Sequence, residues 1–95
     1  MEEFIFIDAR IPAKYEEEHI AGAINIPIEI LRSKCREFEP GKKYITHCLN
    51  DSRGMVAAFL LKNRGFDATC LRGGVSGWMG EVVTGSDGVH MPRGN

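Results

Sequence analysis

One cysteine in the middle of the chain stands at a junction between two structural patterns. The apolar, β-branched run 44–47 predicts a strand that stops at Cys48, and a helical pattern begins near Ser52. Unpaired N–H groups and the helix dipole make a helix N-terminus attractive to anions, and they favour the thiolate form of a cysteine placed there. Cys48 therefore combines a reactive thiolate with an anion site, which suits chemistry on sulfur or phosphorus oxyanions.

Two arginines are candidates for holding the anion. Arg53 falls on the first turn of the expected helix, where a cation is electrostatically unfavourable, and this favours a functional role. Its planar guanidinium suits a two-point contact with a sulfonate or phosphate. Arg10 follows the first expected strand and either approaches the same rim or pairs with Asp8 or a glutamate of 16–18.

The other cysteines and the histidines favour structural roles. We expect Cys35 and Cys70 to be small buried hydrophobic residues. Because the chain has no CxxC pair and no Cys/His cluster with zinc spacing, we expect neither disulfides nor a metal, and no cofactor is implied. Alternation along the strand points His47 away from Cys48, so general base is a poor role for it, and His19 is also expected to be structural.

Size and charge limit the function further. The 95 residues, 43% of them hydrophobic, suit one small domain, expected here to be a monomer, and the net charge of −1 offers no general attraction for nucleic acid or a membrane surface. No apolar run approaches the ~20 residues of a membrane span. The acidic start is no signal peptide, so we expect a cytoplasmic protein, or a periplasmic one whose leader has been removed.

Hydrophobic periodicity predicts an α/β fold. Alternating strands and helices indicate a mainly parallel central sheet flanked by helices on both faces, and ligands bind beyond the carboxyl ends of such strands. After Trp78 the pattern fades, so one domain is expected over 1–80 and an irregular tail over 81–95. The predicted strands are 4–7, 23–26, 44–47 and 68–71, and the predicted helical segments are 12–18, 28–38, 52–64 and 75–79.

The longest predicted helix, 52–64, carries four large apolar residues that recur at positions i, i+1, i+4 and i+5. This spacing predicts that they form one broad apolar face against the sheet. They are Met55, Val56, Phe59 and Leu60.

Three motifs together resemble the rhodanese-like domains and span residues 4–78. The first is FIDAR at 6–10, followed by Tyr15 and by HIAGAINIP at 19–27. The second is CLNDSR at 48–53, similar to the family's catalytic loop, and the third is LRGG at 71–74 followed by Trp78. Each motif alone is weak, but their order and spacing match the family.

The resemblance implies a thiosulfate sulfurtransferase. Cys48 would be the nucleophile that takes the outer sulfur of a small-molecule donor, holds it as a persulfide and passes it to cyanide or a thiol. A thioredoxin-like or sulfur-carrier protein is a further partner that it suggests. The backbone N–H groups that would surround the sulfur belong to Leu49, Asn50, Asp51, Ser52 and Arg53.

Three alternatives remain open. Asp51 stands where the family commonly has glycine, and because its carboxylate opposes entry of an anion, a sulfur relay with a protein donor is the second hypothesis. A phosphatase or arsenate reductase is the third, but related phosphatases use a Cys-x5-Arg loop, and only four residues separate Cys48 from Arg53 here. A non-catalytic binding domain is the fourth.

Overall fold

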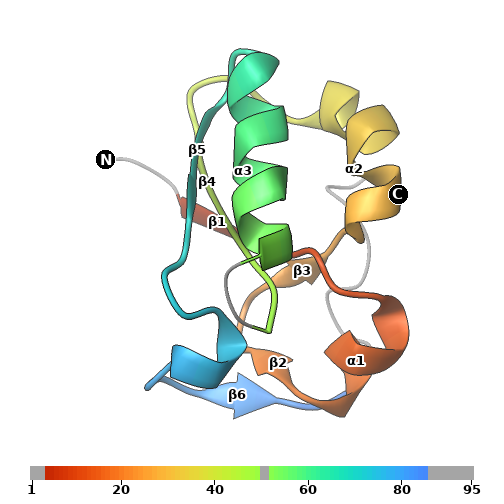
Figure 1. Ribbon diagram of the computed structural model, residues 1–95, viewed down its shortest axis with the longest axis vertical. Coiled ribbons are helices and arrows are strands. Elements are labelled where there is room, and N and C mark those ends of the chain that lie inside the picture. The colour runs from red at the N-terminus through yellow and green to blue at the C-terminus, as the bar shows by residue number, and fades with distance from the viewer. Residues whose placement is uncertain (1–3, 50–51, 86–95) are drawn as a thin grey trace.

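The computed structural model describes residues 4–49 and 52–85, and its centre is a four-stranded sheet (Figure 1). All three neighbouring strand pairs are parallel, in the order β3-β1-β4-β5. The predicted α/β fold with a mainly parallel sheet is therefore confirmed. The strands are β1 Phe4–Asp8, β3 Ile24–Asn25, β4 Lys43–His47 and β5 Asp67–Cys70.

The helices lie close to where the sequence predicts them. The two longer ones, α2 and α3, run side by side in front of the sheet in Figure 1. Within the part of the chain described here, no helix has both the length and the apolar character to cross a membrane. The helices are α1 Pro12–Glu17, α2 Ile28–Lys34 with the 3-10 turn η1 Cys35–Glu37, α3 Ser52–Asn63, and the 3-10 turn η2 Val75–Gly77.

Side chains pack on both faces of the sheet in two clusters. Consecutive residues of β1 point to opposite faces, so Ile7 joins the cluster under α2 and α3, whereas Phe6 packs against the cluster around α1 and η2. The first cluster includes Leu31, Tyr44, Ala57 and Leu61. The second includes Tyr15, Ile20, Ala23 and Val75, with Leu71 and Trp78 packed against it.

The sequence predicts the wrong face of α3 to be buried. Met55, Val56 and Phe59 are exposed, with 58%, 56% and 66% of their surfaces accessible, and Leu60 is only partly buried. Small residues face the sheet instead, because they let the helix backbone come close to the strands. The buried residues of α3 are Gly54, Ala57, Ala58 and Leu61.

The chain stays ordered past the point where an irregular tail is expected. His19–Ile20 (β2) and Val82–Val83 (β6) form a small antiparallel sheet, so the prediction fails for the first residues after 80. The N–H of Ala21 donates to the carbonyl of Glu81 at 3.0 Å, which extends the pairing. Two-residue strands carry no periodic pattern, and the remainder of the expected tail, 86–95, lies outside the described residues.

Candidate active site

Cys48 lies where the sequence predicts it, immediately after the carboxyl end of β4, and it is 3% exposed. The carbonyl of Cys48 accepts a hydrogen bond from the N–H of Val75 at 2.9 Å. The carbonyl of Leu49 accepts from both the N–H and the hydroxyl of Ser76, each at 2.9 Å. The turn η2 therefore fixes the first two residues of the loop.

The other end of the loop is fixed by the start of α3. The hydroxyl of Thr46 donates to the carbonyl of Gly54 at 2.6 Å. A Cβ atom on Gly54 would lie 2.9 Å from Cα of His47 and 3.0 Å from Sγ of Cys70, so only glycine allows this close approach of helix and strand. These contacts hold the start of α3 against the end of β4, next to Cys48.

A cavity of about 430 Å³, called the Cys48 pocket below, is lined in part by Cys48 and has a size suited to a small ligand. One wall comes from the loop and the start of α3, and the other comes from the segment between β1 and α1. Three cations among the lining residues favour an anionic ligand. The lining residues are Arg10, Ile11, Lys14, Glu17, Cys48, Leu49, Ser52 and Arg53.

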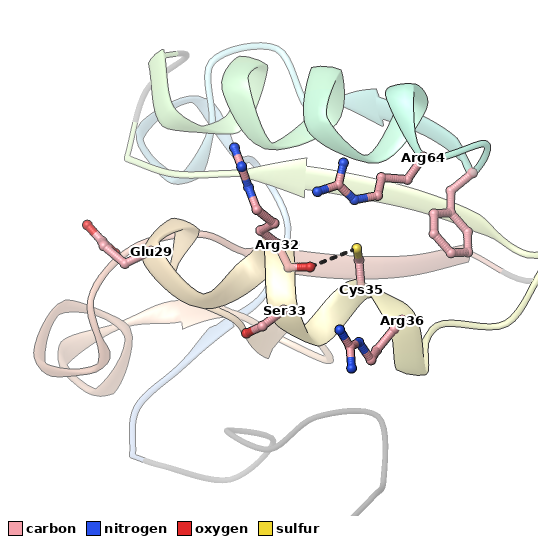
Figure 2. A pocket seen from close by; sticks show the side chains of 7 residues that line it. Glu29, Arg32, Ser33, Cys35, Arg36 and Arg64 are labelled. Atoms are coloured by element: carbon pink, nitrogen blue, oxygen red, sulfur yellow. Dashed lines mark hydrogen bonds between the residues drawn. The ribbon is translucent and has the colours of Figure 1, made fainter.

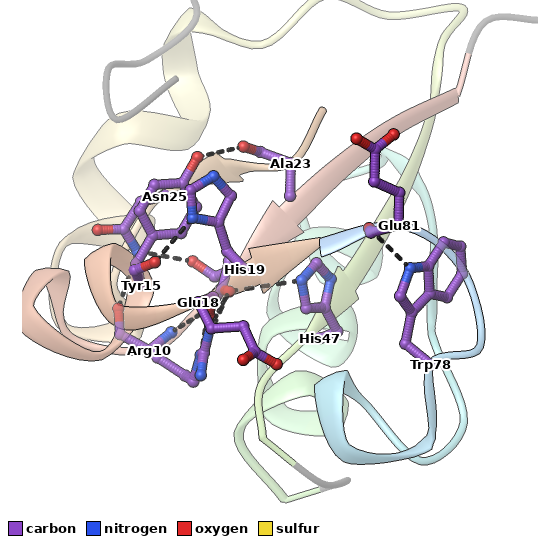
Figure 3. Close-up of polar contacts among 10 residues, drawn as sticks. Arg10, Tyr15, Glu18, His19, Ala23, Asn25, His47, Trp78 and Glu81 are labelled. Atoms are coloured by element: carbon purple, nitrogen blue, oxygen red, sulfur yellow. Dashed lines mark hydrogen bonds and ion pairs between the residues drawn. The ribbon is translucent and has the colours of Figure 1, made fainter. Parts of the chain in front are cut away.

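Arg10 both lines the Cys48 pocket and forms the ion pair that the sequence left open (Figure 3). Its Nη2 lies 2.8 Å from Oδ2 of Asp8, and its Nε donates to Oδ1 at 3.0 Å. Nη2 also donates to the carbonyl of Glu18 at 2.7 Å. The guanidinium is therefore held in place by a buried carboxylate at the edge of the pocket.

A buried polar network continues from Asp8 under the loop. His47 is fully buried, and its Nε2 lies 3.6 Å from Oδ2 of Asp8. Burial raises the pKa of Asp8, but contact with His47 and the hydrogen bonds from Arg10 lower it more, so that the pKa is about 2. The side-chain amide of Asn25 donates to the carbonyls of Asp8 and Arg10 at 3.0 and 2.9 Å.

The histidines take the structural places that the sequence predicts. The imidazole of His47 lies in this buried network, and it is not among the residues that line the Cys48 pocket. Nδ1 of His19 lies 2.7 Å from the carbonyl of Tyr15, and the two rings stack with centroids 3.6 Å apart. His47 and His19 therefore make structural contacts, and neither lines the Cys48 pocket.

Arg53 reaches the Cys48 pocket from the first turn of α3 and is about half exposed. Its Nη1 lies 3.7 Å from Oε2 of Glu29, a carboxylate that is itself exposed. Lys14 has a similar exposed partner in Glu17 at 3.8 Å. An exposed ion pair of this kind is weak, so a bound anion competes readily for either cation.

The structure brings most of the predicted site together. The pocket unites Cys48 with Leu49, Ser52, Arg53 and Arg10. The predicted Asn50 and Asp51 lie outside the described residues.

Sequence reasoning missed the wall formed by Ile11, Lys14 and Glu17. A signal was available, because Pro12 opens a helix directly after β1, which places the first turn of α1 at the carboxyl edge of the sheet. Lys14 lies on that turn and adds the third cation.

The sequence of this chain is similar to the sequences of known proteins. The chain is 36% identical over 77 residues to the uncharacterized protein YqhL of Bacillus subtilis, covering 80% of this chain and 61% of YqhL. It is 40% identical over 37 residues to the thiosulfate sulfurtransferase PspE of Escherichia coli, covering 39% of this chain and 36% of PspE. The chain thus spans less than two thirds of either relative's length.

Solved structures share the fold. A rhodanese-related protein from Thermoplasma volcanium superposes with a TM-score of 0.79 and 32% identity, covering 84% of this chain and 83% of that one. The family profile described as Rhodanese-like domain matches residues 1–81. Since this profile covers most of the sequence and the fold agrees, the chain belongs to the rhodanese-like domain family.

Proposed function

We propose that the chain is a sulfurtransferase that takes sulfane sulfur from thiosulfate or a related donor, carries it on Cys48 as a persulfide and delivers it to cyanide or a thiol. The position of Cys48 carries this proposal. Cys48 lines a small pocket together with Arg10, Lys14 and Arg53, and it lies between the end of β4 and the start of α3 at Ser52. These cations attract a doubly charged donor such as thiosulfate.

The proposed reaction has two displacements. The Cys48 thiolate attacks the outer sulfur of thiosulfate, a new S–S bond forms, and sulfite leaves with the electron pair of the broken S–S bond. The carbon of cyanide then attacks the outer sulfur of the persulfide, and thiocyanate leaves as the thiolate is restored. The persulfide is itself anionic, so the cations and the helix N-terminus favour it as well.

Thiocyanate formation from thiosulfate and cyanide tests the proposal. We expect the wild-type protein to be active and Cys48→Ser to be inactive. Cys35→Ser is the matched control, because Cys35 is also buried but lines a different cavity, and its activity should equal that of the wild type. Equal activity in the wild-type and Cys48→Ser proteins would contradict the proposal.

A sulfur relay between proteins is a second candidate. The apolar side chains of Leu49 and Ile11 are 54% and 45% exposed at the Cys48 pocket, where a partner protein would bury them. Asp51 adds a carboxylate to the same loop. A persulfide on Cys48 after incubation with a persulfidated thioredoxin-like protein, but none after thiosulfate, would favour the relay.

A further inference from the structure

A second cavity, of about 740 Å³, lies between α2 and the end of α3 (Figure 2). Both helices start at the carboxyl edge of the sheet and run toward its amino edge. Since α3 has 12 residues, its end lies roughly 18 Å from its start beside Cys48. The cavity shares no lining residue with the Cys48 pocket, although Glu29, which lines it from the start of α2, pairs with Arg53 of that pocket. The lining residues are Glu29, Arg32, Ser33, Cys35, Arg36, Arg64 and Phe66.

Three arginines line this cavity, called the arginine cavity below: Arg32 in α2, Arg36 in η1 and Arg64 in the turn that follows α3. Figure 2 shows the guanidinium groups of Arg32 and Arg64 reaching into the space between α2 and α3 from opposite walls, with Arg36 on the other side of Cys35. Among the described residues, none of the three has a carboxylate partner. Glu29, which also lines the cavity, pairs with Arg53 instead.

Helix dipoles explain part of this arrangement. Cations near helix C-termini stabilise the helix, and Arg32 and Arg64 lie at or just after the ends of α2 and α3. The dipole does not require the two side chains to face one another across a cavity, where their like charges repel. An anion between them removes that repulsion and makes charge-assisted hydrogen bonds to both guanidinium groups.

The cavity also has an apolar side. Phe66 is partly buried and packs against the core cluster under α2 and α3. Cys35 is 2% exposed, and its thiol donates to the carbonyl of Arg32 at 3.2 Å, so it serves as a small buried wall. The volume is too large for a single phosphate ion and lies within the range of sites for drug-sized or nucleotide-sized ligands.

We propose that the arginine cavity binds a small molecule that carries a diphosphate on an organic group, such as a nucleoside diphosphate. Arg32 and Arg64 hold the diphosphate, because the planar fork of arginine matches phosphate oxygens. Phe66 contacts the organic group. The proposal does not rest on sulfur transfer at Cys48, because this cavity shares no lining residue with the Cys48 pocket.

Titration calorimetry with ADP, pyrophosphate and adenosine tests the proposal. We expect ADP to bind with a dissociation constant below about 1 mM at low salt, pyrophosphate to bind more weakly and adenosine not to bind. Arg32→Gln and Arg64→Gln should each raise the dissociation constant of ADP about tenfold. Lys62→Gln is the matched control, because this exposed cation of α3 does not line the cavity, and it should bind ADP as the wild type does.

Thermal unfolding and thiocyanate formation check that the variants are intact. Because these arginines are exposed but lie near helix C-termini, we expect the midpoint of unfolding to fall by at most a few degrees and thiocyanate formation to match the wild type. Equal ADP affinity in Arg32→Gln, Arg64→Gln and Lys62→Gln would overturn the proposal. So would an absence of binding by both ADP and pyrophosphate.

Discussion

The hydroxyl of Thr46 donates a hydrogen bond of 2.6 Å to the carbonyl of Gly54, across the loop that carries Cys48. Thr46 belongs to β4 and is fully buried, whereas Gly54 lies in the first turn of α3. This bond fixes the distance between the strand end and the helix start. The proposed anion site therefore depends on a contact between Thr46 and Gly54, neither of which lines the Cys48 pocket.

Replacing the Thr46 hydroxyl tests this dependence. Thr46→Val keeps the shape but removes the bond, so we expect a loss of about 1 kcal/mol in the free energy of unfolding and a lower kcat/KM for thiocyanate formation. Thr46→Ser keeps the hydroxyl and should retain most of the activity. Urea denaturation and the enzyme assay are the measurements, and a Val variant with wild-type kcat/KM would contradict the positioning role.

Replacing Gly54 with alanine should change the free energy of unfolding in the direction opposite to the one usual inside a helix. Glycine to alanine inside a helix normally stabilises by roughly 0.5–1 kcal/mol. Here the added Cβ meets Cα of His47 at 2.9 Å, so we expect Gly54→Ala to destabilise by about 1–3 kcal/mol and to reduce activity. Val56→Ala, on the exposed side of the same helix, should leave the unfolding free energy nearly unchanged. A stabilised Gly54→Ala protein would show that the helix start has room to move.

The same contact explains why the orientation of α3 could not be predicted. The apolar spacing of Met55, Val56 and Phe59 predicts a buried stripe, yet these side chains are exposed. Close approach of helix and sheet requires small side chains at the contact, and residue hydrophobicity alone does not reveal it. The strand before Cys48, by contrast, combines Tyr44 with the β-branched Ile45 and Thr46, and its position follows directly from the sequence.

Most of the pocket residues predicted from the sequence are close neighbours in it, and Arg10 is the exception, named because it follows a strand of a parallel sheet. Cys48 and Arg53 belong to one loop and one helix start, so local patterns place them together. Lys14 comes from a distant segment, and only the parallel pairing of β1 with β4 brings it to the same edge. The strands β2 and β6 have two residues each, too few for a periodic signal.

We expect the free energy of unfolding to fall in acid, because the carboxylate of Asp8 becomes protonated. Its pKa is about 2 in the folded protein, below the ordinary value of 3.8, so its contribution to stability is present above pH 4 and is lost as the pH falls toward 2. The size of this contribution is ~2 kcal/mol. The ¹³C shift of the Asp8 carboxyl group, followed by NMR from pH 5 downward, should titrate near 2, and a midpoint near 4 would contradict the buried network.

Arg53 should control affinity for the anionic donor. Arg53→Gln removes a pocket cation, and we expect the KM for thiosulfate to rise about tenfold. Glu29→Gln removes the carboxylate 3.7 Å from Arg53, so the KM should fall about twofold at low salt. Glu37→Gln is the control for an exposed glutamate outside the pocket. If Arg53→Gln left the KM unchanged, Arg53 would be a surface residue without a part in donor binding.

The mass of the intact protein after thiosulfate tests the central claim most directly. We predict that the wild-type protein gains the mass of one sulfur atom, that cyanide removes it, and that Cys48→Ser never gains it while Cys35→Ser and Cys70→Ser do. A sulfur adduct that persists in Cys48→Ser, or a wild-type protein that gains no sulfur from thiosulfate or from a protein persulfide, would contradict the account.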